Sequence, residues 1–321
     1  MIIDRLIDKA IETSNPSVVG LDTCVAYLPE DMQAKCVSLE DAAKYIREFN
    51  FNLIDAIKDI VPGVKVQVAY YEMYGAEGMK TFGDTLAYAR ENGLYTIADV
   101  KRNDIGSTAG AYSKAYLSGI ELGGKRIVPF EADFITVNGY LGSDGINPFV
   151  KDCIEYDKGL FALVKTSNPT SGELQDKQFA SGKTLYEEMG TLVTGWGKEL
   201  IGKYGYSSVG AVVGATHREQ AKIIRDEFKS VFFLIPGYGA QGGKAEDLAV
   251  CFENGIGGVV NSSRGILTAY QKKYQGMSYV EGAKRACADM HALPIWDENP
   301  QEPEIFNASM QSLQGTCAQQ G

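Results

Sequence analysis

Histidine is scarce in this sequence, with only His217 and His291 among 321 residues. A metal centre built on several histidines is therefore not expected. The six cysteines are scattered and form no C-x-x-C pair, so the sequence predicts neither a zinc-binding spacing nor a disulfide framework. A chain of this length needs no disulfides for stability, and free thiols in a cytoplasmic protein are the simpler expectation.

The chain also lacks an excess of positive charge and a long hydrophobic run. Its formal net charge of −10 argues against general binding of nucleic acid or of an anionic membrane, although a local cationic pocket is compatible with a small anionic substrate. No stretch reaches the roughly 18 apolar residues that a membrane-spanning helix requires. Residues 1–14, MIIDRLIDKAIETS, place apolar side chains at helical spacing between charges, which predicts an amphipathic N-terminal helix and not a signal peptide.

Eight short apolar or β-branched runs alternate with helix-like segments. Near-continuous apolar runs are typical of strands buried on both faces of a parallel sheet. The alternation predicts an α/β fold, a (β/α)8 TIM barrel, with the competing architecture being a doubly wound open sheet. No G-x-G-x-x-G follows the first run, which disfavours the open sheet. The runs are VVGLD (18–22), VKVQV (64–68), YTIAD (95–99), DFITV (133–137), LFALVK (160–165), VGAVVG (209–214), VFFLIP (231–236) and GGVVN (257–261).

The spacing of these runs predicts one domain over residues 1–296 with an insertion between the fifth and sixth strands. That gap is long enough for an additional helix around residues 184–204. Residues 297–321 are rich in Pro, Gln, Asn and Glu, which predicts a polar C-terminal tail outside the barrel.

Charged residues gather where the predicted strands end. Asp99 ends the third run and Lys101 follows two residues later, so an extended chain would point both side chains into the barrel mouth. A D-x-K-x-x-D pattern that includes Asp104 is alone equally compatible with a charge pair capping the next helix. Lys65 on a neighbouring strand favours function, because alternating acids and lysines keep one another ionised.

Two further strand ends suggest binding of a phosphorylated ligand. The loop PGYGAQGG (236–243) permits close backbone approach, and Arg264 follows the next strand, where barrels commonly bind phosphate. Arginine holds phosphate through two parallel hydrogen bonds. The segment KTSNP (165–169) offers hydroxyl and amide groups that suit a ring with amide functions, although the same letters make an ordinary turn.

Together these segments resemble orotidine 5′-phosphate decarboxylase. The resemblance rests on VVGLD, VKVQVAYYEMYG (64–75), DVKRNDIGST (99–108), KTSNP, PGYGAQGG and NSSRGI (261–266), and it runs from about residue 15 to about residue 270. The long spacing after the fifth strand is closest to the longer bacterial form. Lys165 before TSNP and His217-Arg218 after VVGAT depart from the expected pattern, but the charged array is intact.

The resemblance implies decarboxylation of orotidine 5′-monophosphate to uridine 5′-monophosphate and CO₂ in pyrimidine biosynthesis, by a cytoplasmic homodimer that needs neither cofactor nor metal. It implies Lys101 as the proton donor to C6 of the pyrimidine and Asp99 beside the substrate carboxylate. It implies that Lys65 pairs with the aspartates and contacts the ribose. It also implies Asp104 and Thr108 as residues that reach the partner's active site. The implied nucleotide-binding residues are Asp22 for the ribose, Ser167 for the pyrimidine, and Gln241 and Arg264 for the phosphate.

Three alternatives accompany this interpretation. The first is a Mg²⁺-dependent decarboxylase or epimerase of the same barrel family that acts on a keto-sugar phosphate. The second is an aldolase with Lys101 as a Schiff base, which two flanking aspartates disfavour because they hold the lysine protonated. The third is a catalytically inactive phosphate-binding barrel, which the presence of every acid and lysine disfavours.

Overall fold

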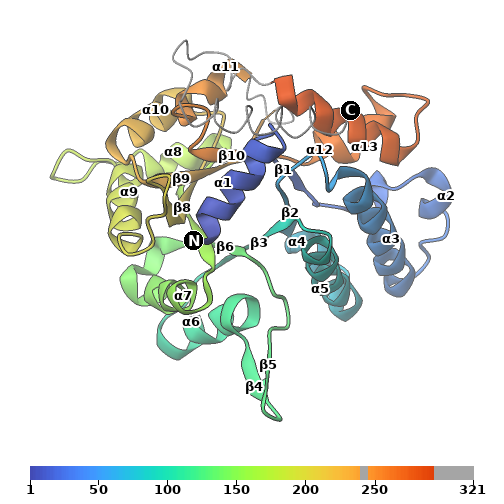
Figure 1. Cartoon of the computed structure of the whole chain (residues 1–321), viewed down its shortest axis with the longest axis horizontal. Coiled ribbons are helices and arrows are strands. Elements are labelled where there is room, and N and C mark those ends of the chain that lie inside the picture. Colours follow the sequence, from blue (N-terminus) through green and yellow to red (C-terminus); the bar gives the residue numbers. More distant parts are fainter. Residues whose placement is uncertain (239–244, 293–321) are drawn as a thin grey trace, which may run out of the picture.

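The computed structural model describes residues 1–238 and 245–292, and their parallel strands close into a barrel. The strands follow one another around the barrel in the order β1-β10-β9-β8-β7-β6-β3-β2 (Figure 1). All eight strands expected from the apolar runs are present within the described residues, so the TIM barrel is confirmed and the open sheet is wrong. The strands are β1 (Ser17–Gly20), β2 (Gly63–Gln67), β3 (Tyr95–Arg102), β6 (Phe134–Val137), β7 (Gly159–Lys165), β8 (Ser207–Val213), β9 (Val231–Ile235) and β10 (Gly258–Ser262).

Helices surround the barrel, and their apolar faces pack against the outside of the strands. The longest of the helices between β1 and β2 is α3, in which the Ser38 side chain accepts a hydrogen bond from the amide of Asp41 and caps the first turn. The helices are α2 (Glu30–Gln33), α3 (Leu39–Ile57), α4 (Ala69–Glu72), α5 (Gly75–Glu91), α6 (Gly106–Ser113), α7 (Ser143–Tyr156), α8 (Gly172–Gln175), α9 (Leu185–Trp196), α10 (Arg218–Glu227), α11 (Ala245–Leu248), α12 (Arg264–Leu267) and α13 (Tyr279–Ala288).

The N-terminal helix α1 (Ile2–Glu12) lies across one end of the barrel (Figure 1). Its Ile3 and Leu6 are fully buried and belong to a second apolar cluster with side chains from inside the barrel, among them Phe134 and Phe161. These phenylalanines stand near the amino ends of their strands. The helix therefore closes the amino-terminal end of the barrel and leaves the carboxyl-terminal end for the site.

The insertion between β7 and β8 contains α8 and α9, which confirms the additional helix expected there. Thr184 caps α9 through a reciprocal pair of hydrogen bonds with Glu187. Helix α9 ends at Trp196, earlier than the range that the spacing suggested. The boundary placed at residue 296 and the tail after it lie outside the described residues.

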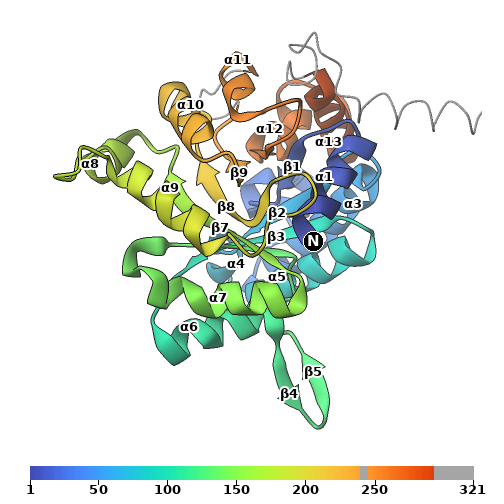
Figure 2. The same ribbon diagram turned by 60° about the vertical axis from the view of Figure 1, so that its left-hand side comes forward.

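A β-hairpin that the sequence analysis did not predict projects from the barrel (Figure 2). Its strands β4 (Ile120–Leu122) and β5 (Lys125–Ile127) pair antiparallel through a two-residue turn. Gly123 and Gly124 both have positive φ, the conformation that such a turn requires. Among the described residues, no helix is long and apolar enough to cross a membrane.

Candidate active site

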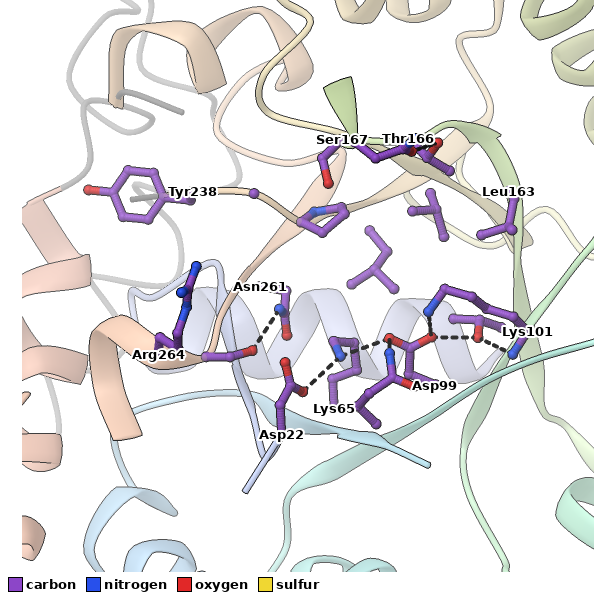
Figure 3. Close-up of a pocket in the computed structure, with 18 of the residues that line it drawn as sticks. Asp22, Lys65, Asp99, Lys101, Leu163, Thr166, Ser167, Tyr238, Asn261 and Arg264 are labelled. Atoms are coloured by element: carbon purple, nitrogen blue, oxygen red, sulfur yellow. Dashed lines mark hydrogen bonds and ion pairs between the residues drawn. The ribbon is translucent and has the colours of Figure 1, made fainter. Parts of the chain in front are cut away.

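A cavity of about 770 Å³ opens at the carboxyl-terminal ends of the barrel strands (Figure 3). It has a charged part around β1, β2 and β3 and a part near β9 and β10 where Arg264 lies. The residues expected at the site that line it are Asp22, Lys65, Asp99, Lys101, Ser167 and Arg264. The fold therefore brings together in one cavity side chains that lie up to about 240 positions apart in the sequence, from Asp22 to Arg264.

Asp99 is the centre of the charged part. One of its carboxylate oxygens accepts hydrogen bonds from Lys65 Nζ at 2.8 Å and from Gln67 Nε2 at 2.9 Å. The other accepts from Lys101 Nζ at 2.6 Å and from Thr136 Oγ1 at 2.8 Å. Four donors on one buried carboxylate hold its position and its orientation.

Lys65 connects Asp99 to Asp22, whose Oδ1 lies 3.3 Å from the Lys65 ammonium. Lys65 is 3% exposed, whereas the Lys101 side chain is 44% exposed and faces the cavity opening. The order Asp22, Lys65, Asp99, Lys101 gives the alternating array that the sequence predicted, with its outermost ammonium accessible to a ligand (Figure 3).

The array keeps two of its buried members ionised. Burial alone would raise the pKa of Asp99, but the ammonium groups of Lys65 and Lys101 outweigh it and hold that pKa well below its ordinary value. Burial alone would lower the pKa of Lys65, but the charges of Asp22 and Asp99 raise it above the usual range. The cavity therefore presents fixed charges at neutral pH.

The pKa shifts of this pair predict how its contribution to stability changes with pH. The lowered pKa of Asp99 gives stability that is complete above about pH 4 and is lost as the pH falls, while the raised pKa of Lys65 gives stability that is lost only above about pH 10. Replacement of Lys65 by methionine is expected to lower the thermal unfolding midpoint by roughly 5–10 °C near neutral pH. The loss should shrink as Asp99 becomes protonated. Thermal unfolding followed by circular dichroism between about pH 2 and pH 8 measures this difference, and a loss that does not shrink below about pH 4 would contradict it.

Lys101 has an unusual backbone conformation for a non-glycine residue, with φ of +45°. The pairing of β3 with β6 shifts register between Ala98 and Arg102, and Thr136 Oγ1 accepts hydrogen bonds from the amides of Val100 and Lys101 across the irregularity. Regular alternation was thus the wrong reason to expect Asp99 and Lys101 together. A bulge directs the lysine, and Thr136 supports both the bulge and the carboxylate.

Two residues that orient Asp99 were missed in the sequence. Gln67 lies two positions after Lys65 on β2 and opposite Asp99 in the register, so strand alternation could have identified it. Thr136 stands within an apolar run, where nothing in the sequence marks its hydroxyl as functional. Asn261, which belongs to the NSSRGI segment noted in the sequence, also lines the cavity, and its buried Oδ1 has no hydrogen-bond partner within the described part of the chain.

The part of the cavity where phosphate is expected lies beside β9 and β10. Arg264 starts α12 directly after β10 and lines the cavity with Pro236, Gly237 and Tyr238. Gly237 has φ of +97°, a conformation that glycine adopts readily. Gln241 lies outside the described residues, so its expected role stays a prediction.

Several polar residues near the strand ends lie outside the cavity of this chain. Asp104 and Thr108, on the loop after β3 and on α6, do not line it, and Thr108 is exposed. Asn138 accepts a hydrogen bond from the amide of Tyr140, and Lys165 is buried behind the cavity wall. The sequence places Lys165 at a strand end like the other charged residues, but it does not join them in the cavity.

No group of three or more histidine, cysteine, aspartate or glutamate side chains with metal-binding geometry occurs within residues 1–238 and 245–292. The acids of the cavity contact lysines instead, at 2.6–3.3 Å. The arrangement suits stabilisation of a developing negative charge and proton transfer from an ammonium group.

Comparison with known proteins agrees with this geometry. The family model described as orotidine 5′-phosphate decarboxylase / HUMPS family matches residues 31–279. The orotidine 5′-phosphate decarboxylase of Clostridium acetobutylicum is 45% identical over 298 residues, which are 93% of this chain and 98% of that protein. The enzyme of the same name from Petrotoga mobilis is 42% identical over 292 residues, 90% of this chain and 96% of that protein.

Solved structures show the same fold. A crystal structure of a Streptomyces avermitilis protein superposes with a TM-score of 0.74 at 28% identity, covering 92% of this chain and 95% of that chain. The structure of Leishmania donovani OMP decarboxylase superposes with a TM-score of 0.67 at 25% identity, covering 91% and 98%. The resemblance inferred from the sequence motifs is thus confirmed over nearly the whole chain, which belongs to the orotidine 5′-phosphate decarboxylase / HUMPS family.

Proposed function

We propose that this protein converts orotidine 5′-monophosphate to uridine 5′-monophosphate and CO₂ in pyrimidine biosynthesis. The single observation that carries the proposal is the array in which Asp99 holds Lys101 at 2.6 Å and Lys65 at 2.8 Å. Relatives that match about nine-tenths of the chain are named for this reaction. The keto-sugar-phosphate alternative is not favoured, because the relatives described above are named orotidine 5′-phosphate decarboxylase.

The reaction demands electrostatic stabilisation. Cleavage of the bond between C6 and the carboxyl carbon releases CO₂ and leaves the electron pair on C6, in the plane of the ring. The ring π system does not delocalise that pair, so a fixed positive charge must stabilise it. Lys101 supplies the charge from the cavity side of the array and then donates a proton from Nζ to C6.

The other residues of the site bind different parts of the nucleotide. Asp99 lies beside the substrate carboxylate, where repulsion is relieved as CO₂ leaves, and Lys65 holds Asp99 in place. Asp22 binds the ribose hydroxyls and Ser167 faces the pyrimidine. Arg264, together with Gln241, holds the phosphate, and this distant binding energy serves to position the ring.

We propose that the reaction needs neither a metal nor an organic cofactor, since the residues of the array supply both the charge and the proton. Purified protein with orotidine 5′-monophosphate and excess EDTA should show loss of the substrate's absorbance. Unchanged absorbance would refute the assignment. Activity that appears only when Mg²⁺ is restored would instead support the metal-dependent alternative.

The phosphate assignment predicts a binding defect. Replacement of Arg264 by alanine should raise KM by about 10- to 100-fold, because a charge-assisted contact of about 1.5–3 kcal/mol is lost. The matched control is Lys222→Ala, which removes one exposed positive charge from α10 and should leave KM unchanged. Steady-state kinetics on both variants measure the effect, and an unaltered KM for the Arg264 variant would place the phosphate elsewhere.

The functional unit that we propose is a homodimer with shared sites. Asp104 and Thr108 lie outside the cavity of their own chain, and the neighbouring Ile105 is 58% exposed. Exposed Tyr140 and Leu141 follow β6, and Leu141 and the backbone of Asp104 both lie against Gly145, which gives this surface an apolar character suited to a second copy. In the dimer, Asp104 and Thr108 complete the site of the partner subunit.

A cytoplasmic location fits the thiol chemistry of the chain. The cysteines of the described region are all free, and burial raises the pKa of the Cys251 and Cys287 thiols to about 12. Such thiols stay protonated and inert at neutral pH.

A further inference from the structure

Lys165 is a fully buried lysine for which the catalytic array has no use. It ends β7, but the register with β8 shifts between Leu163 and Lys165. Leu163 lines the cavity whereas Lys165 does not. The bulge therefore turns the lysine away from the barrel mouth and under the insertion that follows.

The insertion supplies the counter-charge. Lys165 Nζ lies 2.7 Å from Asp176 Oδ1, just after α8, and 5.9 Å from the ring centroid of Tyr186 on α9. A buried ammonium is unfavourable unless it is paired. The position of Asp176 is accordingly tied to the end of β7.

The neighbouring residues on both segments make a second connection. Gln175 Oε1 accepts a hydrogen bond from the amide of Thr166 at 3.0 Å, and Gln175 Nε2 donates to Thr166 Oγ1 at 2.8 Å. Thr166 Oγ1 in turn donates to Asn168 Oδ1 at 2.6 Å. Lys165 and Thr166 thus face Asp176 and Gln175, and we call these four residues the clasp.

The clasp closes a short loop that forms part of the cavity wall. Thr166, Ser167, Asn168 and Gln175 all line the cavity. Thr166 and Ser167 lie side by side on its wall across from Lys101 (Figure 3). The loop therefore borders the part of the cavity in which the nucleotide ring must lie if Lys101 is to reach C6.

The loop is also held from the β8 side. Thr216 Oγ1 donates to the carbonyl of Ser167 at 3.1 Å. Gly214 has no Cβ, and one placed there would come within 2.7 Å of Ser167 Cα. The segment after β8 holds the loop at Ser167, and the clasp holds it at Lys165 and Thr166.

We propose that the clasp is a positioning device for base recognition, which holds Ser167 and Asn168 against the pyrimidine and sets affinity for the base independently of the phosphate. This inference rests on the proposed function, which places the pyrimidine at Ser167. Asp176 does not line the cavity and is a positioning residue that acts through the loop. Gln175 also lines the cavity, and its positioning role is exerted through its two hydrogen bonds to Thr166. Loss of either residue should weaken ligands that carry a base and leave ligands without one unaffected.

The test compares inhibition of decarboxylation by uridine 5′-monophosphate and by ribose 5-phosphate, which differ by the base. In Gln175→Ala, which leaves the ion pair intact, the inhibition constant of the nucleotide should rise about tenfold while that of the sugar phosphate changes less than about twofold. Asp176→Asn should behave in the same way, and Asp176→Glu should restore most of the affinity. Glu173→Gln, an exposed substitution on the same helix, is the matched control.

The outcomes separate the possibilities. Equal weakening of both inhibitors, or no weakening of either in the Gln175 variant, would overturn the role of the clasp. If Asp176→Asn fails to fold because Lys165 is left unpaired, Gln175→Ala still decides the question. Failure of the wild-type protein to turn over orotidine 5′-monophosphate refutes the proposed function itself, and that result is distinct from both.

Discussion

Replacement of Lys101 by alanine is expected to lower kcat by at least about 10³-fold, because both the charge facing C6 and the donated proton are lost. The rest of the array should survive. Asp99 keeps Lys65, Gln67 and Thr136 as partners at 2.8–2.9 Å, so the carboxylate stays paired and oriented. Binding of uridine 5′-monophosphate should change by less than about tenfold, which separates chemistry from recognition.

The backbone at Lys101 requires its own control. With φ of +45°, alanine at this position bears conformational strain that glycine does not. Lys101→Gly removes the same ammonium without that strain, and both variants should be equally inactive. Turnover followed by substrate absorbance and nucleotide binding followed by calorimetry make the comparison. A kcat within about tenfold of the wild-type value in either variant would show that residue 101 does not donate the proton.

The barrel was predictable because its strands are apolar on both faces. Burial between an inner core and outer helices leaves runs such as VFFLIP and VGAVVG with almost no polar interruption, and each of the eight runs became a strand. The hairpin β4–β5 was missed because its strands are exposed, so they have no apolar run to reveal them. The paired glycines at its turn were the available evidence.

The charged array was predictable from strand order, since parallel strands bring their carboxyl ends to one face. Asp22, Lys65, Asp99 and Arg264 reach the cavity for that reason. Lys165 stands at the same level but turns outward, because a bulge changes the direction of a side chain without leaving a mark in the residue pattern.

The hydrogen-bond partners of Asp99 show a second kind of contact that could not be predicted from the sequence. Threonine is common in strands, so Thr136 does not stand out in the sequence. Its hydroxyl contacts Asp99 and the amide of Val100 because β6 lies beside the irregular end of β3. Hydrogen bonds between neighbouring strands depend on register, which a one-residue shift changes completely. The sequence shows which residues are able to form such hydrogen bonds, but only the strand register in the folded barrel shows which of them do.

The proposed sharing of sites between two subunits predicts the second large effect, in which two inactive proteins become active when mixed. Asp104→Ala and Lys101→Ala should each abolish most turnover as homodimers. In a mixed dimer, the Lys101 of one subunit meets the Asp104 of the other at one site, while the second site lacks both. Random exchange in an equal mixture makes about half of the dimers mixed, so about a quarter of wild-type activity should return.

Subunit exchange under mild denaturation, followed by the absorbance assay, measures this recovery. Mixing Lys101→Ala with Asp99→Ala is the matched control, because Asp99 and Lys101 contact each other within one chain. Every subunit of that mixture lacks one member of its own pair, and activity should not return. Absence of recovery in the first mixture, with subunit exchange demonstrated by mass spectrometry, would mean that Asp104 serves its own chain. The loop after β3 would then have to move in order to bring that carboxylate into the cavity, from which it is excluded in this conformation.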